Sequence, residues 1–163
     1  MANTTYHPSS VYPSTVDLNL IRSQSSVWAI PVARVLFSLL FVYSGLGHFA
    51  DQTIAYGASK GVPMANILVP FSGIMIIVGG LSVMLGYHAR IGALLIMLFL
   101  ATVTGIMHNF WAISDPAQAQ VETIAFMKNL SLFGGALLLC FYGAGPISVD
   151  AWTERKNIET TKY

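Results

Sequence analysis

The chain has 163 residues, of which 55% are hydrophobic and only 9% are charged. Soluble domains carry about 25% charged residues to keep their surface in water, so this composition excludes a soluble globular protein. The formal net charge of +1 and the lack of a basic stripe exclude nucleic acid as a partner. The single cysteine, Cys140, excludes an intrachain disulfide and redox chemistry that needs a pair of cysteines.

In chain order, a polar segment comes first and four long apolar segments follow it. The polar segment covers residues 1–26, and the apolar segments cover residues 27–49, 64–85, 91–111 and 124–144. Each apolar segment has about 20 residues, the length at which an α-helix crosses the hydrocarbon core of a bilayer. Backbone groups in lipid must be satisfied within the segment, so helices are expected and strands are not.

The connections between these segments are short, which favours antiparallel packing of neighbouring helices. The predicted fold class is therefore an all-α membrane protein, an antiparallel bundle of four transmembrane helices. This domain spans residues 27–150, and a polar C-terminal tail of residues 151–163 follows it. The lipid bilayer is thus the first predicted partner.

The distribution of lysine and arginine predicts which side of the membrane each end of the chain occupies, because cytoplasmic loops are enriched in these residues. The side that holds both tails and the middle connection carries Arg22, Arg90, Arg155, Lys156 and Lys162. The other side carries only Lys60. This bias predicts that the N and C termini are both cytoplasmic.

Titratable side chains within apolar segments are costly to bury, so they are candidates for function. The alternation of the spans brings His48, His108 and the start of the fourth span to one outer membrane face. Trp111 lies beside His108, and the fourth span carries a lysine and an asparagine there. The candidate binding residues are His48, His108, Trp111, Lys128, Asn129 and, at the other end of the first span, Arg34. No catalytic residue is identified.

A purely structural interpretation of this cluster stays open. Polar side chains near helix ends reach to the membrane surface, and tryptophans anchor helices there. For Arg34 there are two alternatives: the side chain extends to the membrane surface, or it stays buried beside a partner such as Asp150. A haem between His48 and His108 is disfavoured, because the second histidine pair expected of such proteins is missing. A metal site of two histidines and a carboxylate is disfavoured in the same way, so no metal is predicted.

Several short segments follow one another in a characteristic order: SGLGHF at 44–49, GVP at 61–63, HNFW at 108–111, FMKNL at 126–130 and GAGPISVD at 143–150. In order and spacing they resemble the DoxX family of small membrane proteins, over most of the chain apart from its N-terminal tail. The resemblance implies a four-helix, multi-pass protein of the bacterial inner (plasma) membrane. It also implies an association with membrane oxidoreductase systems, in which a DoxX-like chain partners a second subunit.

The first functional hypothesis follows from that resemblance: an accessory subunit of a quinone-linked membrane oxidoreductase or redox complex. His48 or His108 would hydrogen-bond a quinone carbonyl, Lys128 would stabilise the reduced ring, and Trp111 would stack on it. The cofactor is otherwise unknown. A non-catalytic structural or assembly subunit and a small-anion transporter are the alternatives, and enzymatic activity is left open. Other membrane-protein subunits or a homo-oligomer are the expected protein partners.

Overall fold

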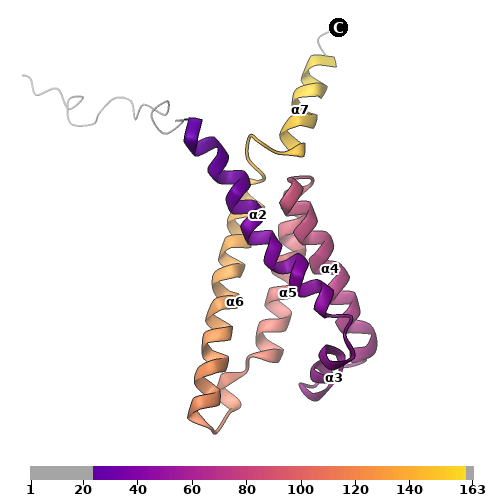
Figure 1. Ribbon diagram of the computed structural model, residues 1–163, viewed down its shortest axis with the longest axis vertical. Helices are drawn as coiled ribbons and strands as arrows, with labels where there is room; N and C mark the ends of the chain where they lie inside the picture. The colour runs from indigo at the N-terminus through magenta and orange to yellow at the C-terminus, as the bar shows by residue number, and fades with distance from the viewer. Residues whose placement is uncertain (1–23, 161–163) are drawn as a thin grey trace, which may run out of the picture.

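The computed structural model describes residues 24–160, and all regular structure in that range is helical. The elements are α2 (Gln24–Gly47), α3 (Asp51–Ser59), α4 (Ala65–Leu85), α5 (Ala89–Met107), the 3-10 helix η2 (Phe110–Ala112), α6 (Pro116–Tyr142) and α7 (Val149–Thr160) (Figure 1). Four of them, α2, α4, α5 and α6, are long and apolar enough to cross a membrane. For the described residues, this confirms the predicted all-α class with four candidate spans.

The fourth span begins earlier than its hydropathy predicts. α6 begins at Pro116 rather than near residue 124. Asp115 caps this helix, because its side chain accepts a hydrogen bond from the Gln118 backbone N–H at 3.2 Å. Proline at the first helical position gives up no intrahelical hydrogen bond. The prediction followed apolar residues alone, so it missed the polar first turns of α6.

Two shorter helices lie outside the predicted spans. α3 follows α2 almost directly and packs against α4. α7 covers most of the predicted polar tail of residues 151–163, so that segment is helical through Thr160. The two helices lie at opposite ends of the long axis of the molecule (Figure 1), so each end of the bundle is identified by one of them.

The spans pack in chain order, α2 against α4, α4 against α5, and α5 against α6. α2 runs obliquely across the others (Figure 1). It reaches α6 at Phe37, whose ring lies 3.0 Å from where a Cβ on Gly135 would stand. α4 and α5 approach closely at Gly79 and Gly92, where a Cβ on Gly79 would lie 2.9 Å from the Gly92 carbonyl oxygen. Small residues at helix contacts are what close packing in a membrane requires.

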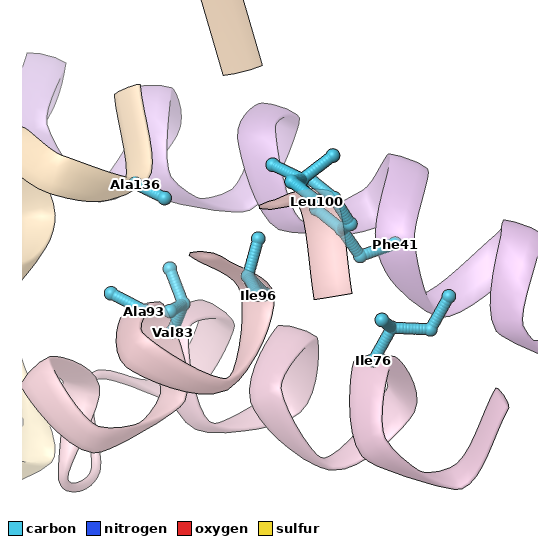
Figure 2. Packing of buried hydrophobic residues seen from close by; sticks show 7 residues of the cluster. All are labelled: Phe41, Ile76, Val83, Ala93, Ile96, Leu100 and Ala136. Carbon is cyan, nitrogen blue, oxygen red and sulfur yellow. The ribbon is translucent and has the colours of Figure 1, made fainter. Parts of the chain in front are cut away.

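A small apolar core lies where the four spans meet (Figure 2). It consists of Phe41, Ile76, Val83, Ala93, Ile96, Leu100 and Ala136. The outward faces of the same helices carry large apolar side chains, such as Leu36, which is 66% exposed, and Leu138, which is 60% exposed. Such faces suit hydrocarbon rather than water, so lipid is the natural surrounding of this bundle.

Candidate functional site

The structure brings two of the predicted site residues, His48 and His108, to one cavity. His48 directly follows α2 and His108 directly follows α5, so both lie at the end of the molecule that holds α3 (Figure 1). The cavity has a volume of about 500 Å³ and is bounded by α3, α4 and α5. This volume is in the range of sites that bind small molecules.

Apolar side chains form most of the cavity wall. The larger ones from α4 and α5 are Leu68, Phe71, Met75, Phe99, Val103 and Ile106. Phe71 is 59% exposed and Ile106 is 37% exposed on the surface of the bundle. The cavity therefore opens sideways between α4 and α5. Among the described residues, no aspartate, glutamate, lysine or arginine lines it.

His48 is held in this wall by α4. Its Nδ1 lies 2.9 Å from the Ser72 Oγ, and the Ser72 hydroxyl donates a hydrogen bond to the Val69 carbonyl at 2.7 Å. The imidazole also packs on the Phe99 ring, with 5.6 Å between centroids. Burial lowers the pKa of the His48 imidazole, and the Val69 carbonyl opposes this with a smaller effect. The net lowering favours the neutral imidazole.

His108 is held by a carboxylate from α6. Its Nδ1 lies 2.7 Å from Glu122 Oε2, and Glu122 Oε1 lies 3.6 Å from the Lys60 Nζ. The Lys60 ammonium also lies 5.5 Å from the centre of the Tyr56 ring on α3. These contacts tie together the ends of α3, α5 and α6 beside the cavity, and they give His108 a fixed hydrogen-bond partner.

Three other predicted site residues lie outside the cavity wall. Lys128 is exposed on α6. Trp111 is 63% exposed and packs edge-on against Phe110 and Phe126. Asn129 is buried on α6 and does not line the cavity. Of the residues predicted to converge on one membrane face, only His48 and His108 therefore line this cavity.

Arg34 lies near the end of the molecule that holds α7, away from the histidines. Its guanidinium is buried and donates to three backbone carbonyls, those of Met84, Ala144 and Ile147. Asp150, the partner considered from the sequence, instead accepts hydrogen bonds from two backbone N–H groups at the start of α5. Arg34 thus joins α2, α4 and the segment that follows α6, which gives it a structural setting rather than a place in the cavity.

A profile of the SURF4 family matches residues 23–157. The chain belongs to the SURF4 family. Two relatives in Escherichia coli are similar over most of their length. Inner membrane protein YphA is 31% identical over 121 residues, which are 73% of this chain and 86% of YphA. Inner membrane protein YqjF is 32% identical over 127 residues, which are 77% of this chain and 92% of YqjF.

A more distant SURF4-type relative comes from yeast. ER-derived vesicles protein ERV29 of Saccharomyces cerevisiae is 30% identical over 88 residues, which are 54% of this chain and 27% of ERV29. No solved structure matches the chain. The relatives show that this SURF4-family chain is a membrane protein, with bacterial relatives in the inner membrane.

Membership of the SURF4 family overturns the DoxX resemblance, which was wrong. The segments behind that resemblance are short, and three of the five contain glycine. Close helix packing in membranes favours small residues in many unrelated proteins. The predicted role in a quinone-linked oxidoreductase rested on the resemblance and falls with it. The expected partner subunits or homo-oligomer stay a prediction.

Sequence reasoning identified neither Ser72 nor Glu122 as a partner of the two histidines. Ser72 is one hydroxyl within an apolar span, and nothing in the local pattern distinguishes it. Glu122 carried a usable signal, because the early N-cap of α6 places it on a helix 14 residues from His108 rather than in a loop. Recognising Asp115 and Pro116 as a helix start would have revealed this pair.

Proposed function

We propose that this SURF4-family protein binds a single-chain amphiphile that it takes from the surrounding bilayer into the cavity between α4 and α5. The observation that carries the proposal is the combination of an apolar wall, a sideways opening and two histidines in one cavity. Ligand sites are typically apolar clefts with a few placed polar groups, and this cavity has that composition.

The position of the opening supports a ligand that comes from lipid. Phe71 and Ile106, which line the cavity and are exposed, lie on two candidate spans whose outward faces are apolar. An alkyl chain would therefore pass from hydrocarbon to cavity without crossing water. His48 and His108 follow the ends of their spans, where the polar head of an amphiphile lies in a bilayer.

The relatives support the membrane setting of this proposal. YphA and YqjF are inner membrane proteins by name, and ERV29 is named for vesicles derived from the ER. By analogy we place this chain in a bacterial inner membrane, as a multi-pass protein with its transmembrane domain at 27–150 and both termini in the cytoplasm. Under this orientation the cavity opens toward the outer leaflet.

Photochemical labelling tests the proposal. The full chain is purified in a mild detergent and irradiated with a photoreactive diazirine analogue of hexadecanol. We expect labelled peptides from α4 and α5 that contain the cavity wall. Thr102→Trp places an indole at the exposed edge of the cavity and should reduce this labelling about tenfold, the effect of roughly 1.4 kcal/mol of lost binding.

The matched control is Leu94→Trp, on the same helix two turns earlier. Leu94 is 47% exposed and does not line the cavity, so this variant should label as the native protein does. The proposal would be contradicted if lipid-facing peptides throughout the bundle were labelled equally and Thr102→Trp did not change this labelling. The probe would then react only with the apolar outer surface.

A further inference from the structure

A second, more polar groove lies at the end of the molecule that holds α7, opposite the cavity of the two histidines (Figure 1). It has a volume of about 690 Å³ and lies between α7, the start of α5 and the segment that follows α6. Tyr87 and Tyr142 line it and are exposed. Tyrosines favour the boundary between hydrocarbon and water. Since the ends of two candidate spans form this groove, it lies at the level of lipid headgroups.

One wall of the groove carries a positive charge. Arg90, the second residue of α5, is exposed, and within the described part of the chain it forms no ion pair. Its guanidinium lies against the backbone of Gly143, because a Cβ on that glycine would stand 3.3 Å from the Arg90 Nε and 3.8 Å from its Nη2. Gly143 itself lines the groove. This contact places the guanidinium at the groove wall.

The wall formed by α7 is acidic. Asp150 and Glu154 both line the groove, and they share one face of α7 because they are four residues apart. Hydrogen bonds from the backbone N–H groups of His88 and Ala89, at 2.8 Å and 3.2 Å, hold the Asp150 carboxylate at the start of α5. Glu154 is exposed and pairs with no cation among the described residues. It is therefore the carboxylate that is left for a ligand.

The charges of the two walls specify the ligand. Arg90 forms no ion pair with Asp150 or Glu154, although all three line one groove. A ligand with only negative charge would meet two carboxylates, and a ligand with only positive charge would meet the guanidinium. A ligand that carries both a phosphate and an ammonium group suits both walls, because guanidinium groups bind phosphate and carboxylates accept hydrogen bonds from ammonium.

We infer that this groove binds the zwitterionic headgroup of a phospholipid, with its phosphate on Arg90 and its ammonium on Glu154. The inference is independent of the proposed function, since the groove and the cavity lie at opposite ends of the bundle. The groove also continues into an apolar surface, which favours a lipid over a free phosphoethanolamine. Ile91 lines the groove, and Leu98 follows two turns later on the same face of α5, both of them exposed. An acyl chain can lie along these side chains.

Native mass spectrometry of the full chain in a mild detergent tests the inference. Phosphatidylethanolamine and phosphatidylglycerol with the same acyl chains share the phosphate and differ in the ammonium. We expect the ethanolamine lipid to bind at a concentration about fivefold lower, the effect of one exposed ion pair at the upper end of its range. Equal binding of the two lipids would overturn the inference. Glycerophosphoethanolamine, the same headgroup without acyl chains, should not bind at these concentrations, and binding as tight as that of the lipid would overturn the assignment to a lipid.

Two substitutions test the two walls separately. Glu154→Gln should remove the preference for the ethanolamine lipid without weakening the binding of phosphatidylglycerol, whereas Arg90→Gln should weaken the binding of both lipids. The matched controls are Asp51→Asn, at the exposed start of α3, and Lys156→Gln, an exposed residue of α7 outside the groove wall. Both controls should keep the native affinities, and all four variants should keep the native Tm. If Glu154→Gln and Arg90→Gln bound both lipids as the native protein does, the lipid would lie elsewhere and the inference would be wrong.

Discussion

At the scale of single residues, Arg34 is the most heavily connected charged side chain of the described chain, and its connections are all to backbone. Burying an arginine in a span is costly unless its donors find acceptors. Three carbonyls supply them, two from the irregular segment after α6 and one from the last turn of α4. These carbonyls in turn need donors, because helix ends and irregular backbone leave oxygens unpaired. The terminal guanidinium nitrogens and these carbonyls therefore satisfy each other, while the buried Arg34 Nε has no hydrogen-bond partner.

Replacing Arg34 should destabilise the fold without touching the cavity. Arg34→Met leaves buried carbonyl oxygens without donors and should cost about 3 kcal/mol in the free energy of unfolding, a fall in Tm of roughly 6 °C or more. Arg34→Lys keeps the charge, but one ammonium cannot imitate the planar fork of a guanidinium, so an intermediate loss is expected. Thermal unfolding in detergent measures both variants.

The control for this experiment is Arg90→Met, which removes an exposed arginine near the same end of the molecule. Its Tm should stay within a degree or two of native. If folded Arg34→Met protein is photolabelled in the cavity as strongly as the native protein, the result agrees with a structural role for Arg34. A selective loss of labelling at unchanged Tm would instead return Arg34 to the binding site.

At the scale of elements, α7 is joined to α5 through Asp150. Its carboxylate accepts from the backbone N–H of His88 at 2.8 Å and from that of Ala89 at 3.2 Å, and its own N–H donates to the Gly86 carbonyl at 2.9 Å. The first N–H groups of a helix lack partners within it and lie at the positive end of its dipole. Asp150 therefore caps α5 from a distance of 61 residues along the chain.

Asp150→Ala should loosen α7 more than it destabilises the spans. Loss of a helix cap costs about 1 kcal/mol, so Tm should fall by only roughly 2–4 °C. Hydrogen exchange should accelerate in peptides covering α7 and the start of α5, while α4 stays protected. Glu154→Ala, on the exposed side of α7, is the comparison variant. If it accelerated exchange equally, the effect would be one of net charge and not of the cap.

The elements also show what the sequence could and could not predict. The four spans were predictable because a run of about 20 apolar residues is the length of one membrane-crossing helix. α3 was missed because its nine residues are of mixed polarity and leave no hydropathy signal. The convergence of His48 and His108 followed from span direction alone. Their partners did not, since Ser72 and Glu122 depend on how α4 and α6 are rotated, and rotation is set by close contacts such as that of Gly79 with Gly92.

At the scale of the whole molecule, the arrangement of the charges gives the bundle two unlike ends. Arg90, Arg155 and Lys156 lie at the end with α7, where Arg155 also donates to the Pro146 carbonyl at 2.7 Å. The end with α3 holds Lys60, and that cation is paired with Glu122. If all four candidate spans between residues 27 and 142 cross the bilayer, the two flanking segments lie on the same side. From the excess of cations at the α7 end we predict that this side is the cytoplasmic one.

Reporter fusions test this orientation directly. Green fluorescent protein fluoresces when it is held in the bacterial cytoplasm, and alkaline phosphatase is active only outside it, so either end of the chain should give fluorescence and no phosphatase activity. Neutralising Arg90, Arg155 and Lys156 together to glutamine removes three exposed cations from the α7 end. This change should yield a fraction of inverted molecules with phosphatase activity at the C terminus. Lys60→Gln, which lowers the charge of the opposite end, should leave the native orientation unmixed. Phosphatase activity at either end of the native chain would place the cavity on the inner leaflet and reverse the direction from which its ligand is drawn.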